Sequence, residues 1–252
     1  DFIFRVRELE QMEIEYFVNP ENWKENFEAL VKDTKQFFTI LGFSSENIHE
    51  LEIEKEDLAH YSQRTIDFEF DYPFGKKELS GLAYRTDFDL KSHIETSGQK
   101  LDYLDQETNE KIIPHVIEPS FGIDRLVLAI LADAYAEDEM DGEVRTYLKL
   151  APAVAPIKVA VFPLLKNRPE LQEKAREVYA KIKKEIPQII FDDNGNVGKR
   201  YRRQDEIGTP FCITIDFETL EQNSGVTVRD RDSGKQDRVS EEDLISYLKG
   251  RL

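Results

Sequence analysis

The sequence predicts an α+β protein of two domains, residues 1–150 and residues 151–252. The first observation is the alternation of apolar and polar residues over 65–72, followed by Pro-Phe-Gly and a second strand over 77–85, which is typical of an antiparallel hairpin. The second is a change at residue 157 to a strand, helix, strand order, which predicts a parallel pair joined by a right-handed crossover. We therefore expect an antiparallel sheet with helices first, and then an α/β domain with a mixed five-stranded sheet.

The charge changes near the same boundary. The formal net charge is -17, which taken alone argues against a nucleic-acid binder. Residues 157–252 carry 18 Lys and Arg against 17 Asp and Glu, a balance of +1, so the remaining -18 lies on residues 1–156. The asymmetry indicates two domains with different roles.

Composition sets further bounds. With 252 residues, 40% of them apolar, and 16 Phe, the chain can bury a substantial core. Its apolar runs stay well below the roughly 20 residues of a membrane span, and its start does not resemble a signal peptide, so we expect a cytoplasmic protein with no membrane partner. Cys212 lies in an apolar run, which favours a small buried side chain over a nucleophile. The four histidines show no metal-ligand spacing.

Residues 2–17 alternate as one strand if no bulge intervenes. The charged face carries cations at one end and carboxylates at the other, about 20 Å apart at roughly 3.3 Å per residue. A half-buried strand with a solvated charged face explains the same pattern. The expected apolar face is Phe2, Phe4, Val6, Met12, Ile14 and Tyr16, and the charged face is Arg5, Arg7, Gln11, Glu13 and Glu15.

Four further segments complete the first domain. A helix is expected from Asn19-Pro20 to Gly42, and a shorter one, capped by residues 86–89, that ends at Gly98. The acidic stretch 50–57 is interpreted as a solvated face without function, and residues 100–113 as a polar, hairpin-like stretch. In the strand at 65–72, Ile66, Phe68, Phe70 and Tyr72 are expected to point inward.

Residues 114–135 are the segment around which the domain is organised. A buried strand runs through Gly122 into a helix, and it carries Glu118 and Ser120 on one side. Arg125 lies in the first helical turn, where the helix dipole disfavours a cation unless an anion binds there. Pairing of Arg125 with Asp124 or Glu118 in an ordinary strand-to-helix corner remains an alternative.

Three segments resemble the class II aminoacyl-tRNA synthetases, in the form found in glycyl-tRNA synthetases. "IEPSFGIDR" at 117–125 resembles motif 3, "FRVRELEQMEIEYF" at 4–17 resembles the second strand of motif 2, and residues 65–90 resemble the segment between these motifs. The resemblance implies that Arg5, Arg7 and Arg125 act in catalysis and that ATP is a substrate with Mg2+, for which Glu78 is the expected ligand. The ATP-binding residues it implies are Phe4, Arg5, Val6, Arg7, Glu8, Leu9, Glu78, Leu79, Gly122, Ile123, Asp124 and Arg125. The glycine-binding residues it implies are Leu9, Glu10, Gln11, Met12, Glu13, Arg85, Glu118, Pro119, Ser120, Phe121 and Gly122.

Within this set, Arg85 is placed by the resemblance to meet the glycine carboxylate. An ion pair with Asp87 or Asp89 is the alternative. Glu13, Glu118 and Ser120 would hold the ammonium group.

In the second domain, strands are expected at 157–165, 188–191, 211–216, 226–230 and 236–239, with helices at 170–186, after 199 and at 244–248. Residues 200–216 and 226–239 resemble the anticodon-binding domain shared by glycyl-, histidyl-, prolyl- and threonyl-tRNA synthetases. The densest basic cluster would attract phosphate, with Tyr201 and Phe217 available to stack on bases. The implied tRNA-binding residues are Lys199, Arg200, Tyr201, Arg202 and Arg203; a solvated helix face is the alternative.

The expected function is that of a glycyl-tRNA synthetase, which joins glycine to tRNA(Gly) with ATP as a homodimer. The family's motif 1 and first motif 2 strand would precede Asp1, so we expect a C-terminal portion that is inactive alone. A noncatalytic accessory or RNA-binding subunit is the alternative.

Overall fold

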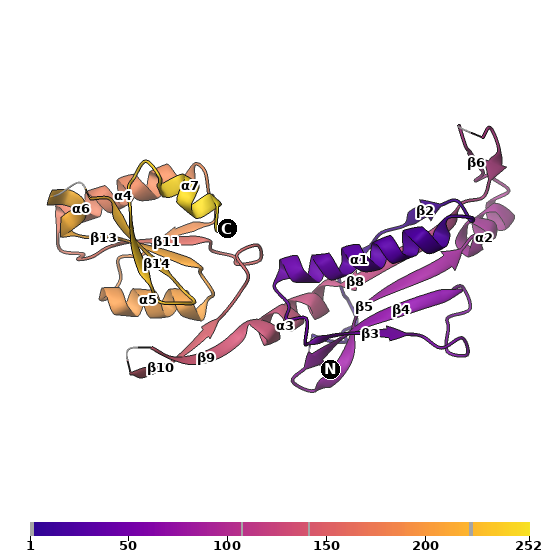
Figure 1. Ribbon diagram of the computed structural model, residues 1–252, viewed down its shortest axis with the longest axis horizontal. Helices are drawn as coiled ribbons and strands as arrows, with labels where there is room; N and C mark the ends of the chain where they lie inside the picture. The colour runs from indigo at the N-terminus through magenta and orange to yellow at the C-terminus, as the bar shows by residue number, and fades with distance from the viewer. Residues whose placement is uncertain (1–2, 107, 141, 222–223) are drawn as a thin grey trace. The chain divides into compact units, whose positions relative to one another are not determined.

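The computed structural model describes residues 3–106, 108–140, 142–221 and 224–252 (Figure 1). The chain divides into two compact units, Asp1–Asp133 and Ala134–Leu252. No helix in these described ranges combines the length and apolarity that a membrane span requires.

The first unit is built on an antiparallel sheet of six strands in the order β1-β8-β5-β4-β3, with β2 also paired to β8. Its hairpin, β4 and β5, and its central strand β8 confirm the sequence prediction. The strands are β1 Gln11–Glu13, β2 Tyr16–Val18, β3 Ile48–Glu52, β4 Arg64–Tyr72, β5 Gly75–Thr86 and β8 His115–Gly122. A small hairpin of β6 (Tyr103–Leu104) and β7 (Lys111–Ile112) lies in the stretch expected to be hairpin-like.

Helix α1 (Trp23–Leu41) covers one face of this sheet (Figure 1). Trp23 stacks on Tyr84 with ring centroids 4.0 Å apart, and Phe38 packs edge-on against Phe68 at 5.4 Å. The inward residues predicted for β4 are all buried in this core. Because side chains alternate along a strand, Glu118 and Ser120 of β8 point to the opposite face. That face carries the candidate site.

Helices end where glycine was expected to end them. Gly42 and Gly98 both adopt left-handed φ angles, 93° and 68°, after α1 and after α2 (Phe88–Ser97). Helix α1 begins at Trp23, later than the expected start at Asn19-Pro20, because those residues form a turn in which Asn19 Oδ1 accepts from the Glu21 amide. Strand β8 continues through Gly122 into α3 (Ile123–Ala134), as predicted.

The single strand predicted over residues 2–17 is wrong. Phe2 lies outside the described residues; residues 3–10 form turns and loop, and only the short β1 and β2 pair with β8. Gln11 pairs with Gly122, where β8 ends, and the Ile123 amide donates to the Glu10 carbonyl as α3 begins. Residues before Glu10 therefore run past the end of β8, where no strand of the described chain is available to pair with them.

The second unit has the predicted mixed five-stranded sheet, in the order β12-β11-β13-β14-β15. Strands β12 (Ile189–Phe191) and β13 (Phe211–Ile215) run parallel to β11 (Val159–Pro163), whereas β14 (Val226–Asp230) and β15 (Gln236–Val239) complete it in antiparallel fashion. Helices α4 (Pro169–Lys183) and α7 (Leu244–Lys249) pack on one face and α5 (Val197–Glu206) on the other (Figure 1).

Four elements had not been predicted. Strand β3 and the short helix α6 (Phe217–Glu221) are two of them. The others form a charged hairpin of β9 (Tyr135–Met140) and β10 (Glu143–Leu148), which we call the acidic hairpin. It belongs to the second compact unit, so the units divide earlier than the expected limit at residue 150.

Candidate functional site

A cavity of about 260 Å³ lies at the junction of β8 and α3. We call it the helix-end cavity. Nine residues expected to bind ATP line it, namely Phe4, Arg5, Val6, Leu9, Glu78, Leu79, Gly122, Asp124 and Arg125. Its wall also includes Ser80, whose buried Oγ has no hydrogen-bond partner among the described protein groups. The cavity thus brings together a cation, apolar side chains and a hydroxyl group without a hydrogen-bond partner at the first turn of a helix.

Arg125 is held in place by neighbours other than Asp124 or Glu118. Its guanidinium lies 4.4 Å from the Phe4 ring centroid and donates to the carbonyls of Phe4 and Glu78, each at 3.3 Å. Its Nη1 also lies 3.2 Å from Glu78 Oε2. Since the Glu78 carboxylate is half exposed, this ion pair is weak and an anionic ligand can replace it.

A second cavity, of about 490 Å³, lies on the open face of the sheet. We call it the sheet-face cavity. Five residues expected to bind glycine line it: Gln11, Glu13, Arg85, Glu118 and Ser120. Glu13 pairs with Ser120 across β1 and β8, which places both on the same face as Glu118.

Two carboxylates of this cavity, Glu118 and Asp67, resist ionisation. Burial raises the pKa of Glu118 to about 7, with Arg85 opposing the shift and Glu15 and Glu13 adding to it. Burial, reinforced by Glu78 and Glu69, likewise raises the pKa of Asp67 to about 6. A cluster of desolvated carboxylates favours a cationic ligand, because a positive charge restores the ionised form.

The two cavities share three lining residues, Gln11, Glu78 and Ser120. Gln11 Nε2 donates to Ser120 Oγ at 2.7 Å, so this pair forms part of the common wall. A cation-bearing cavity and a carboxylate-bearing cavity therefore adjoin, and two ligands can lie with their ends in contact.

Several expected residues lie elsewhere. Arg7, Glu8 and Ile123 do not line the helix-end cavity, and Glu10 and Met12 do not line the sheet-face cavity. Leu9 and Gly122, expected at both sites, line only the first. Pro119 and Phe121 were expected in the glycine site but are buried on the opposite face, where Phe121 packs against Phe37 at 5.3 Å. Alternation along β8 explains this placement, since a ligand on the open face meets Glu118 and Ser120.

Four residues of the sheet-face cavity and its surroundings were not among the expected site residues. Asp67 alternates with the residues of its strand that were expected to point inward, and its face proves to be the cavity wall. Glu15 lies close enough to Glu118 to raise the pKa of that carboxyl group. Tyr61 and Asp89 contact Arg85. Asp89 had been considered as an ion-pair partner, whereas Tyr61 lies in a loop for which the sequence offers no signal.

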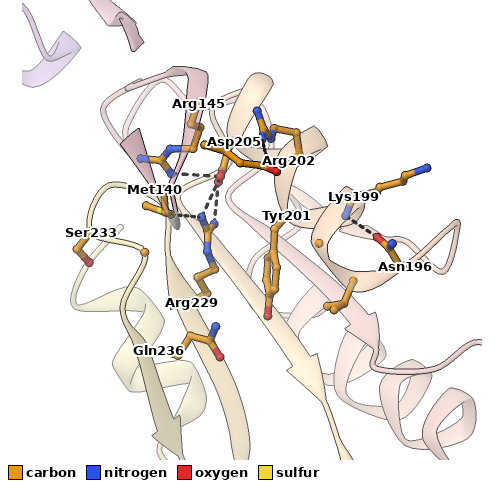
Figure 2. Close-up of a pocket in the computed structure, with 14 residues that line it drawn as sticks. Met140, Arg145, Asn196, Lys199, Tyr201, Arg202, Asp205, Arg229, Ser233 and Gln236 are labelled. Atoms are coloured by element: carbon orange, nitrogen blue, oxygen red, sulfur yellow. Dashed lines mark hydrogen bonds and ion pairs between the residues drawn. The ribbon is translucent and has the colours of Figure 1, made fainter. Parts of the chain in front are cut away.

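In the second unit, a pocket of about 800 Å³ lies beside α5 (Figure 2). We call it the α5 pocket. Lys199, Tyr201 and Arg202 line it on α5, Arg229 and Gln236 on β14 and β15, and Met140, Glu143 and Arg145 on the acidic hairpin. Buried Asp205 joins two walls, accepting from Arg229 at 2.8 and 2.9 Å and from Arg145 at 3.1 Å.

The basic cluster divides between the surface and the core. Arg200 is only 1% exposed, and its guanidinium donates to the carbonyls of Pro163, Asp193, Asn194 and Gly195, so it cannot offer charge to a phosphate. Arg203 is paired with Asp192 at 2.6 Å and does not line the pocket. Phe217 does not line it either.

Tyr201 and Cys212 are both packed. The Tyr201 hydroxyl bonds to Thr214 Oγ1 at 2.6 Å, and the Arg229 guanidinium lies 4.9 Å from its ring centroid. Cys212 is buried as predicted, and burial raises the pKa of its thiol.

Comparison with known proteins agrees with this arrangement. Residues 2–134 match the family model described as "tRNA synthetase class II core domain (G, H, P, S and T)". The chain belongs to this family. Residues 158–251 match a second model, "Anticodon binding domain", so the acidic hairpin lies between the two matched ranges.

Two similar curated proteins carry the same name. The chain is 50% identical over 249 residues to a protein of Clostridium tetani named "Glycine--tRNA ligase", covering 98% of this chain and 53% of that protein. A protein of the same name from Thermobifida fusca is 49% identical over 260 residues, covering 100% and 56%. The chain thus spans about half the length of the curated relatives it matches.

Proposed function

We propose that the protein containing this chain activates glycine with ATP and transfers it to tRNA(Gly). The observation that carries the proposal is the adjoining pair of cavities, one with Arg125 at a helix end and the other with Arg85 among carboxylates. ATP would occupy the helix-end cavity, and glycine the sheet-face cavity. The names of the relatives support this choice of amino acid.

The reaction needs little from the protein beyond position and fixed charge. An oxygen of the glycine carboxylate attacks the α-phosphorus, a carbon–oxygen–phosphorus link forms, and the bond to pyrophosphate breaks. The nucleophile is already ionised at neutral pH, so no general base is required. Arg5 and Arg125 would offset the negative charge that develops on the phosphorus.

A magnesium ion fits this site in a limited way. Mg2+ bound with nucleotides usually takes one or two protein carboxylates and completes its shell with phosphates and water. Glu78, half exposed and lining both cavities, can be such a ligand. The described residues hold no group of three or more His, Cys, Asp or Glu arranged for a metal, so the ion would enter with the nucleotide.

Selection of glycine would depend on recognising both charged ends while leaving no room for a β-carbon. Glu13, Glu118 and Ser120 would bind the ammonium group and Arg85 the carboxylate. Changing Glu13→Gln or Glu118→Gln in the full-length protein is expected to raise the glycine KM tenfold or more, roughly the loss of one charged hydrogen bond. The ATP KM should hardly change; equal losses for both substrates would refute the assignment.

The test of the function is glycine-dependent exchange of pyrophosphate into ATP by the full-length protein, with serine and alanine as controls. Exchange with glycine alone is the expected result. If the protein gives none, the alternative is a noncatalytic RNA-binding subunit, which the α5 pocket would serve; binding of tRNA(Gly) would then be measured.

Three further features are proposed on family grounds. The RNA would contact the α5 pocket through Lys199 and Arg202, the protein would be a homodimer, and it would act in the cytoplasm. Sedimentation of the full-length protein tests the second point, since a monomer at micromolar concentration would contradict it.

A further inference from the structure

Arg85 is the most closely surrounded cation on the open face of the sheet. Its Nε and Nη2 donate to the two carboxylate oxygens of Asp89 at 2.8 and 3.0 Å, and its Nη1 lies 3.0 Å from Glu118 Oε2. The Tyr61 ring centroid lies 4.1 Å from the guanidinium carbon. The side chain is 17% exposed, so these contacts are shielded from water.

The two carboxylates reach Arg85 from different sides. Glu118 lines the sheet-face cavity together with Arg85, whereas Asp89 does not line it. A carboxylate ligand that enters the cavity therefore competes with Glu118 for Nη1 and leaves the bidentate contact with Asp89 intact. Bidentate pairing also fixes the plane of the guanidinium, which a single contact does not.

The backbone around Arg85 is shaped to make this contact. The β5–β8 register shifts between Tyr84 and Thr86, so Arg85 lies at a bulge. Thr86 has φ 58°, a left-handed conformation that is unusual for a β-branched residue. The turn that follows starts α2, and Asp89 in its first turn reaches back to Arg85. Bulges and strained residues of this kind commonly redirect a side chain at a functional site.

We propose that Asp89 is a positioning residue for amino-acid binding: it holds Arg85 from outside the cavity, so that the Nη1 edge can pass from Glu118 to the carboxylate of the substrate. The inference rests on the proposed function. In the structure, Arg85 and Glu118 form an ion pair with each other. Glycine, with one charge of each sign, would separate them, giving its carboxylate to Arg85 and its ammonium to Glu118. Without Asp89, Arg85 would keep only Glu118 as a carboxylate partner and would block that exchange.

The test compares Asp89→Asn with Asp87→Asn in the full-length protein by pyrophosphate exchange. Asp87 is a matched control because it lies in the same turn and makes an i,i+4 ion pair of the same kind, with Lys91 at 2.8 Å. Asp89→Asn is expected to raise the glycine KM about tenfold or more, the loss of a hydrogen-bonded charge pair, and the ATP KM less than about twofold. Asp87→Asn should change neither by more than about twofold.

A second arm separates positioning from general damage. In an Arg85→Lys background, where no guanidinium plane remains to be held, adding Asp89→Asn should raise the glycine KM by less than about twofold more. If the two effects multiply fully, or if ATP and glycine KM rise together, Asp89 is merely structural and the inference is overturned. If the unsubstituted protein shows no glycine-dependent exchange, the proposed function is overturned as well. If the unsubstituted protein exchanges normally and Asp89→Asn leaves the glycine KM unchanged, only the inference is overturned.

Discussion

At the scale of single residues, the pKa of Glu118 is the property that a measurement in solution can test most directly. Its carboxyl is held against Arg85 on one side and faces Glu13 and Glu15 on the other, and burial raises its pKa to about 7. An ammonium ligand needs the ionised form. Under the proposed function, binding of glycine is therefore coupled to loss of a proton near neutral pH.

This coupling predicts a pH-dependent glycine KM. Because the folded-state pKa is raised, Glu118 is increasingly protonated as the pH falls through 7, and the apparent glycine KM should rise about tenfold between pH 8 and pH 6. Asp67, with a pKa of about 6, adds to the loss at still lower pH. The measurement is pyrophosphate exchange at varied glycine concentration across this range.

Two controls accompany the profile. The ATP KM should stay nearly constant between pH 6 and 8, and Glu118→Gln should make the glycine KM high and nearly independent of pH over the same interval. A steep profile that persists in Glu118→Gln would assign the titration to another group.

At the scale of elements, α5 shows how one basic run serves two purposes. Arg200 faces the sheet and is bonded to four main-chain carbonyls, whereas the Arg202 side chain is 41% exposed and pairs with Glu143 of the acidic hairpin at 3.1 Å. Two residues apart on a helix, they point in different directions. The sequence alone could not distinguish them, since both are arginines in the same cluster.

Arg200→Ala is expected to destabilise the second unit by about 3 kcal/mol or more, because buried carbonyls lose their donors. Arg202→Ala should cost less than about 1 kcal/mol. Urea unfolding followed by far-UV circular dichroism reports both units, while fluorescence of Trp23 reports the first unit only, since the chain has one tryptophan. We expect Arg200→Ala to shift the dichroism and leave the Trp23 midpoint unchanged; a comparable shift of the Trp23 transition would contradict the prediction.

The elements also show where sequence patterns suffice. The β4–β5 hairpin and the helix ends at Gly42 and Gly98 were predicted, because alternation and glycine caps are local signals. The strand over residues 2–17 failed because pairing depends on a neighbour, and β8 ends at Gly122. The acidic hairpin was missed because ion pairs such as Arg145 with Asp205 attach it, so it lacks the apolar period that reveals a strand.

In the candidate site, too, some residues are predictable from a local sequence pattern and others are not. Glu118, Ser120 and Arg125 were found because one short segment carries them on a strand-to-helix junction. Most of the remaining site residues came from the family resemblance. Tyr61 reaches Arg85 from a loop distant in sequence, a contact that only the folded chain creates.

At the scale of the whole molecule, the sites proposed for the chemistry and for the RNA contacts belong to different compact units. Arg125 and both cavities of the proposed catalytic site lie in the first unit, and the α5 pocket lies in the second. The charge follows this division, since residues 1–133 carry 14 Lys and Arg against 29 Asp and Glu, a balance of -15, and residues 134–252 carry 20 against 22, a balance of -2. The attraction of RNA phosphates proposed for this protein would therefore be local, and exposed Lys199 and partly exposed Arg202 line the α5 pocket that would supply it.

The division predicts that adenylate formation and tRNA binding can be separated by mutation. In the full-length protein, Arg125→Ala should lower glycine-dependent pyrophosphate exchange by two orders of magnitude or more, roughly the loss of a fixed cation at the reacting phosphate, and leave the Kd for tRNA(Gly) unchanged. Lys199→Ala with Arg202→Ala should leave exchange unchanged, weaken tRNA binding roughly tenfold, and reduce the slope of log Kd against log salt by up to about two.

Lys166→Ala is the control, an exposed lysine of the second unit outside the pocket, paired with Asp193 at 3.4 Å. Loss of exchange in the Lys199 and Arg202 double variant would mean that the α5 pocket takes part in adenylate formation, and the assignment of one step to each unit would be wrong.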